Sequence, residues 1–307
     1  MISTLSTWYD TNPHFCEGYG TAPSSPEIVN SLTSITMTFV GIHGLVNLVR
    51  IKSEKYELSM MVNTLYIYYF SLCALIVNGI NSGVYHGTLQ RGWAGMDVSS
   101  MIMILFPMCY ELLRSISFLK CDKGTNNTIL RLVSFAILVE LGILTCVLGS
   151  IENGHTFSSI AFFGVMVVAL VIIGYHLYND DISSNCRQCL MSTIGFTLIA
   201  IIFWASVEFI CELESTSDTV KKILSYIPSH GIWHITISIA GYNLIYGTML
   251  YFYKCLRLVP YEYTIFNYAL PRVDYEEDIF ADPKIEGTEL VTITSLNLKN
   301  RLRVNLD

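Results

Sequence analysis

Long, uninterrupted runs of apolar residues dominate the pattern along the chain. Seven of these runs are about as long as a membrane-spanning helix, which needs roughly 17–25 residues, and they lack the polar–apolar alternation of half-buried strands. The predicted spans cover residues 31–49, 60–83, 97–113, 129–150, 156–178, 191–210 and 230–253. The pattern therefore predicts an all-α fold, a seven-transmembrane-helix bundle.

Composition agrees with a membrane protein. The chain has 307 residues, of which 52% are hydrophobic and 14% charged, whereas soluble domains carry roughly 25% charged residues. We expect an N-terminal segment over residues 1–30, a seven-helix transmembrane domain over 31–253, and a tail over 254–307 that is acidic and disordered. No basic patch suggests a nucleic-acid partner, and no protein partner is evident.

The positions of Lys and Arg predict the orientation, because short cytosolic loops carry an excess of both. Basic residues follow the first and seventh spans, as at Arg50 and Lys254, and also surround the link between the third and fourth. The opposite face carries only Arg91, Lys221 and Lys222. We therefore expect a lumenal or extracellular N-terminus and a cytosolic C-terminus.

In this orientation, three helix ends bring polar residues to one membrane depth. Ser82 and His86 end the second span, Asp97 begins the third, and His230 and His234 begin the seventh. Residues four apart share a helix face, and two such histidines can chelate one metal ion. Ionisable groups inside a membrane are costly and usually functional. Three neutral imidazoles and a water would form an open zinc site of the catalytic type.

Each of these residues also has a simpler explanation. Asp97 or His230 could cap a helix, and a single histidine at a helix end is more often packed or interfacial than a ligand. Two further histidines on the outer face, His14 and His155, are alternative ligands. The pair formed with His234 lacks the glutamate of an HExxH helix, so a general base must come from elsewhere, and Asp97 is the nearest candidate by topology.

The same residues resemble the pattern of a known family. The run from Ser82 to His86, Ser-Gly-Val-Tyr-His, followed by Asp97, resembles the S-x-x-x-H…D pattern of the alkaline ceramidases. Residues 230–234, His-Gly-Ile-Trp-His, resemble that family's H-x-x-W-H motif. Weaker similarities occur at residues 15–17, 27–30, 204 and 211–212, so the resemblance covers about residues 14–256. The family belongs to a superfamily of seven-span hydrolases that includes the adiponectin and progestin receptors.

The resemblance implies a zinc-dependent hydrolase that cleaves the amide bond of ceramide, a membrane lipid, to a sphingoid base and a free fatty acid. The implied roles are zinc ligation by His86, His230 and His234, proton transfer by Asp97, oxyanion stabilisation by Ser82, and contact with the substrate's polar head by Trp233. An endoplasmic reticulum or Golgi location is expected from the family alone.

The resemblance also implies a disulfide and a second metal ion. Cys16 and Cys211 would form a disulfide bond on the outer, oxidising side. The family places a calcium ion beside the zinc site, and its acidic ligands here would be Glu17 and Glu27. The chain departs from the family pattern in that segment, with His14 in the place of the leading aspartate, which argues against calcium binding.

Two other functions are compatible with histidines inside a membrane. One is a receptor of the adiponectin and progestin type, in which zinc is structural. Those receptors usually have a cytosolic N-terminus, so the loop charges and the H-x-x-W-H form of the motif favour the hydrolase. The other is a haem protein ligated by paired histidines from two helices.

Overall fold

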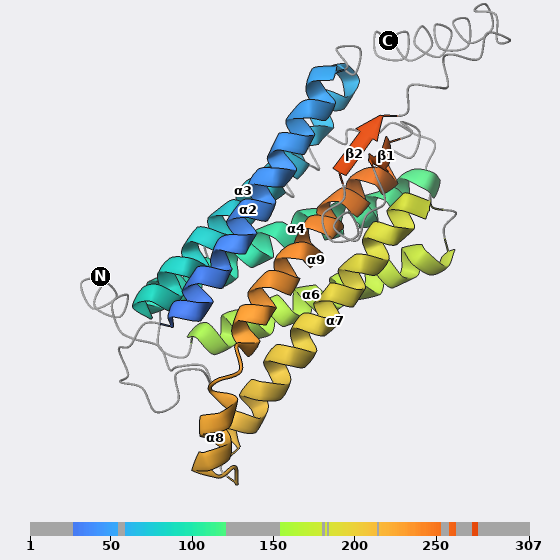
Figure 1. Ribbon diagram of the computed structural model, residues 1–307. Coiled ribbons are helices and arrows are strands. Elements are labelled where there is room, and N and C mark those ends of the chain that lie inside the picture. The colour runs from blue at the N-terminus through green and yellow to red at the C-terminus, as the bar shows by residue number, and fades with distance from the viewer. Residues whose placement is uncertain are drawn as a thin grey trace, which may run out of the picture.

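The computed structural model describes residues 27–54, 59–120, 154–179, 182, 184–213, 215–252, 258–261 and 272–275. Within these ranges the chain forms α2 (Ile28–Glu54), α3 (Ser59–Thr88), α4 (Arg91–Lys120), α6 (Gly154–Asn179), α7 (Ser184–Glu212), α8 (Asp218–Leu224), α9 (Ser229–Phe252), β1 (Leu258–Tyr261) and β2 (Arg272–Tyr275). Figure 1 shows the long helices packed along one another, with the short helix α8 at one end of the bundle and the two strands at the other.

Five helices of the described residues are long and apolar enough to cross a membrane. Their apolar stretches are Ile28–Val49, Tyr66–Thr88, Arg91–Leu113, Ile160–Tyr178 and Ser184–Cys211. They confirm five of the predicted spans and indicate an integral membrane protein. The predicted span over residues 129–150 lies outside the described residues, and the orientation stays a prediction.

Helix α9 is also long enough to cross a membrane but is not among the five apolar helices. It contacts α2, α3, α4 and α7, so most of its surface faces other helices. Polar side chains such as His234, Asn243 and Thr248 are buried along it. A central position explains this composition, because polar groups inside a membrane are tolerated where they face the interior of a bundle.

Two glycines allow close packing of α2 against α3. A Cβ atom on Gly79 would lie 2.7 Å from the backbone nitrogen of Thr38 and 2.9 Å from the carbonyl oxygen of Ser34. A Cβ atom on Gly41 would lie 2.6 Å from Cγ1 of Ile76. Small residues permit such close approach of helices in membranes. This packing holds the start of α2 against the end of α3.

A tight turn joins α3 to α4. Leu89 is fully buried and has a φ of 56°, the left-handed conformation that often ends a helix. Its N–H donates to the carbonyl of Tyr85. For a residue other than glycine this conformation costs about 1 kcal/mol. The turn ends α3 just after His86 and places the first turns of α4, with Asp97, beside it.

Two short strands follow the bundle in the part of the predicted tail that the structure describes. Strands β1 and β2 pair antiparallel, with Leu258 opposite Tyr275 and Tyr261 opposite Arg272, and β2 contacts α2. Valine and tyrosine at these positions favour strands. The fold is therefore all-α within the described bundle but carries a small sheet after it. Helix α8, which Ser217 caps, was also not predicted.

We predict that Gly79→Ala destabilises the protein, because backbone atoms of α2 cannot move away from the added methyl group. The expected fall in the melting temperature in detergent is about 2–10 °C, since overpacking costs about 1–3 kcal/mol. Gly164→Ala on α6 is the matched control, because a Cβ atom there meets nothing within 4 Å. Equal melting temperatures for the two variants would contradict the close packing.

Candidate metal centre

The three histidines predicted as ligands lie together at one end of the bundle. His86 comes from the last turn of α3, and His230 and His234 come from the first turns of α9. One ring nitrogen from each lies within 4.8 Å of the others, and all three side chains are buried. The ring centroids are 4.6 to 4.9 Å apart. The four-residue spacing in α9 therefore turns both of its imidazoles toward α3.

Glu27 orients His86. Its Oε2 atom lies 2.6 Å from Nδ1 of His86, and the amide of Asn30 donates to the same oxygen over 3.1 Å. The backbone N–H of Glu27 also donates to the carbonyl of His86, at 2.9 Å. With Nδ1 turned to the carboxylate, Nε2 is the ring atom left for a metal ion. Metal-binding histidines commonly have such a carboxylate partner.

His234 is held from α2 in a similar way. Its Nδ1 atom lies 3.1 Å from the hydroxyl oxygens of both Thr33 and Ser34. Its Nε2 atom lies 3.4 Å from Oγ of Ser82. The first turns of α2 thus position two of the three histidines, one from α3 and one from α9.

The arrangement fits a metal ion. The three buried imidazoles each bring one ring nitrogen to within 4.8 Å of the others. A cation bound between them could be shared by all three nitrogens. Three imidazole nitrogens form the ligand set of an open zinc site. The site can therefore hold a metal ion.

Asp97 lies beside the histidines in a network of hydrogen bonds. The side-chain nitrogen of Asn78 donates to Oδ1 of Asp97 over 2.7 Å and to its backbone carbonyl over 2.9 Å. Oγ of Ser34 donates to Oγ of Ser82 over 3.0 Å, and Ser82 lines the same cavity as Asp97. The bonds from Asn78 hold the carboxylate next to the site.

Three residues that position the groups of the site, Asn78, Thr33 and Ser34, were not predicted from the sequence. Asn78, Ser82 and His86 recur every four residues and so share one face of α3; this spacing was the signal for Asn78. Thr33 and Ser34 gave no such signal, because hydroxyl groups in apolar helices usually bond the backbone of their own helix.

A cavity opens beside the histidines. It is lined by Ser82, Asp97, His230, Trp233 and His234, together with Met37, Tyr85, Ala94, Val98, Met101, Phe162, Phe163 and Trp204. Trp233, which the sequence predicted near a substrate head, is 5% exposed and packs on Trp204 with ring centroids 5.3 Å apart. Polar groups occupy one part of this cavity and aromatic rings another.

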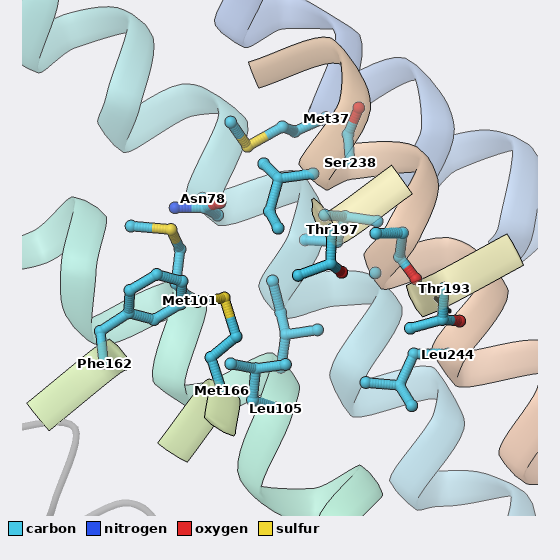
Figure 2. A pocket seen from close by; sticks show the side chains of 15 residues that line it. Met37, Asn78, Met101, Leu105, Phe162, Met166, Thr193, Thr197, Ser238 and Leu244 are labelled. Carbon is cyan, nitrogen blue, oxygen red and sulfur yellow. Dashed lines mark hydrogen bonds between the residues drawn. The ribbon is translucent and has the colours of Figure 1, made fainter. Parts of the chain in front are cut away.

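A second cavity lies deeper in the bundle. Met37, Met101 and Phe162 line both cavities, so the two adjoin. Figure 2 shows the methionine and phenylalanine side chains around the second cavity, with Asn78 at its edge. Most of its lining is apolar. The bundle therefore contains an apolar space next to its polar site.

The remaining predicted residues are only partly described. Cys16, Glu17 and His14 lie outside the described residues, and His155 lies in α6, where its side chain is not described. Calcium binding by Glu17 and Glu27 therefore stays a prediction.

Cys211 forms a disulfide bond. The four other cysteines in the described ranges, Cys73, Cys109, Cys186 and Cys189, form no disulfide bond. The partner of Cys211 is therefore outside these ranges, and its pairing with Cys16 stays a prediction.

These features define a membrane-embedded helical protein with a buried three-histidine site. The family model named Ceramidase matches residues 10–273, which is most of the chain. The chain therefore belongs to the Ceramidase family. Membership implies a hydrolase that acts on an amide bond and a lipid substrate. No curated protein gives a significant match to the chain.

We predict that Glu27→Gln weakens metal binding, because a neutral amide orients and polarises His86 less well than a carboxylate. The expected loss in affinity for Zn²⁺ is about 10- to 100-fold, measured by competition with a chelator. Ser31→Ala is the matched control, since Ser31 bonds the carbonyl of Gly83 in the same helix pair. An affinity unchanged by Glu27→Gln would show that this carboxylate does not support the ligand.

Proposed function

We propose that this chain is a zinc-dependent ceramidase that hydrolyses the amide bond of ceramide to a sphingoid base and a free fatty acid. One observation carries the proposal: three buried imidazoles lie within 4.8 Å of one another, beside a cavity that Asp97 and Ser82 also line. Membership of the Ceramidase family supports the substrate and does not favour the receptor alternative.

In this proposal His86, His230 and His234 hold the zinc ion. Zinc bound by three imidazoles supplies an activated water and polarises a carbonyl group. Glu27 keeps the ring of His86 in one tautomer and one orientation. Thr33 and Ser34 do the same for His234.

Asp97 is the proposed general base and acid. Its carboxylate takes a proton from the water that attacks the carbonyl carbon, and later gives a proton to the nitrogen as the carbon–nitrogen bond breaks. Water and ceramide thus yield the fatty acid and the free amine. Asn78 acts through Asp97: its two hydrogen bonds, to Oδ1 and to the backbone carbonyl, fix the plane of the carboxylate.

Ser82 is proposed to stabilise the negative charge that develops on the substrate's carbonyl oxygen. Its Oγ lies 3.4 Å from Nε2 of His234 and lines the cavity together with Asp97. Oγ of Ser34, 3.0 Å away, donates to Ser82 and keeps that oxygen in place.

The two adjoining cavities support a lipid substrate. The polar head would lie near Trp233 and the catalytic groups, and an apolar chain would extend into the deeper cavity. Such a site suits a substrate whose chains stay inside the bilayer. The loop charges add a lumenal or extracellular position of the site to the proposal. The family resemblance adds a Cys16–Cys211 disulfide and a location in the endoplasmic reticulum or Golgi.

We predict that Asp97→Asn lowers kcat for ceramide about 10²- to 10⁴-fold, which is the range for loss of a general base, and leaves zinc bound. His230→Ala should lose both activity and metal. The measurements are fatty-acid release by mass spectrometry and zinc content per chain in purified protein.

The control for the histidine variant is His43→Ala. The side chain of His43 contacts Asn47 and Tyr242, away from the three-histidine site. It should retain zinc and activity. Wild-type rates in both Asp97→Asn and His230→Ala proteins would refute the mechanism. A Soret absorbance band in place of zinc would support the haem alternative.

A further inference from the structure

The cavity beside the histidines is lined by an indole ring whose N–H group has no partner in the described part of the chain. Trp204 comes from α7, and its Nε1 atom is buried without a hydrogen bond. An indole N–H only donates, and when it is buried it usually finds an acceptor. A buried donor left unpaired costs about 1–3 kcal/mol. Trp204 therefore brings to the cavity a donor that no described residue uses.

Aromatic packing holds the Trp204 ring in one orientation. Phe163 stacks on it, with ring centroids 5.5 Å apart and an angle of 18° between the planes. Trp233 packs against it at 5.3 Å, and the His230 ring meets it edge-on at 6.2 Å. Neither Phe163 nor Trp233 carries a hydrogen-bond acceptor in its side chain. Phenylalanine in place of Trp204 would give the same stacking without a donor, so packing alone does not explain the tryptophan.

The molecule that fills the cavity is the remaining source of an acceptor. Ser82 on α3 and Asp97 on α4 line the same cavity as Trp204, and α6 and α9 each contact both α4 and α7. The catalytic groups and the indole therefore line the cavity from different helices. In the proposed reaction the metal ion and Ser82 stabilise the carbonyl oxygen of ceramide, and Asp97 gives a proton to its nitrogen. The two hydroxyl groups of the ceramide head are left as acceptors for the indole N–H.

The position of Trp204 along α7 decides between these two hydroxyl groups. Thr197, which lines the deeper apolar cavity, lies about 10 Å from Trp204 along the helix at 1.5 Å per residue. Trp204 instead contacts His230 in the first turn of α9, away from that cavity. The secondary hydroxyl of ceramide is on the carbon that continues into the sphingoid chain, whereas the primary hydroxyl ends the head. The primary hydroxyl therefore lies farther from the chains and reaches the level of Trp204.

We infer that the indole N–H of Trp204 donates a hydrogen bond to the primary hydroxyl of ceramide and so helps to select the substrate by its head. This bond holds the head on the α7 side of the cavity, while Ser82 and Asp97 act on the amide from α3 and α4. The inference rests on the proposed ceramide hydrolysis and adds a substrate-binding residue to it.

The test measures kcat/KM on three substrates with the same two chains: ceramide, a 1-deoxyceramide without the primary hydroxyl, and a 3-deoxyceramide without the secondary one. Wild-type protein should prefer ceramide over 1-deoxyceramide about 3- to 10-fold, which is what one hydrogen bond contributes. Trp204→Phe should lose this factor on ceramide and on 3-deoxyceramide, because both carry the primary hydroxyl. On 1-deoxyceramide the variant should keep the wild-type rate.

Phe163→Leu is the matched control, because it removes the ring stacked on Trp204 and leaves the N–H group in place. It should keep the preference for ceramide over 1-deoxyceramide. The inference is overturned if wild-type protein shows no such preference, a comparison that needs no variant. It is also overturned if Trp204→Phe slows ceramide and 1-deoxyceramide equally, as a structural role would, or spares 3-deoxyceramide, which would place the contact at the secondary hydroxyl. Failure of wild-type protein to hydrolyse any of the three would instead refute the proposed function, and the inference with it.

Discussion

The hydrogen bond between Glu27 and His86 is the contact on which the site depends. Burying an imidazole and a carboxylate in an apolar bundle is unfavourable unless each satisfies the other. Here the two side chains meet at 2.6 Å, and the backbone groups of the same two residues also bond. The start of α2 is therefore fixed to the end of α3, and the close packing at Gly79 continues this alignment along both helices.

Because α2 is held in this position, its side chains also contact α9, the third helix of the site. Thr33 and Ser34 lie within two turns of Glu27 and contact Nδ1 of His234 on α9. Helix α9 can carry buried polar residues because other helices surround it. The site is thus assembled from one helix that supplies supporting contacts and two that supply histidines, with α4 adding Asp97.

Much of the bundle could be predicted from sequence because the signals were local. The length of apolar runs gave five spans that the structure confirms, and the four-residue spacing of His230 and His234 gave two ligands on one face. The supporting contacts could not be predicted in the same way. Glu27 precedes its helix and belongs to no periodic pattern, and its role depends on how α2 packs against α3.

Other features required the packed structure. The sheet of β1 and β2 follows the membrane helices, and its register, with Val259 opposite Asp274 and Tyr261 opposite Arg272, was not predicted from the sequence. Side-chain contacts between helices far apart in sequence decide both the supporting residues of the site and the lining of its cavities.

The measurement that tests the central claim most directly is zinc X-ray absorption spectroscopy on the purified, full-length protein. Three imidazole ligands and one water predict a first shell of nitrogen and oxygen atoms at about 2.0–2.1 Å, with multiple-scattering features typical of histidine. A shell that contains sulfur at about 2.3 Å, or a folded protein without zinc, would contradict a three-histidine zinc centre.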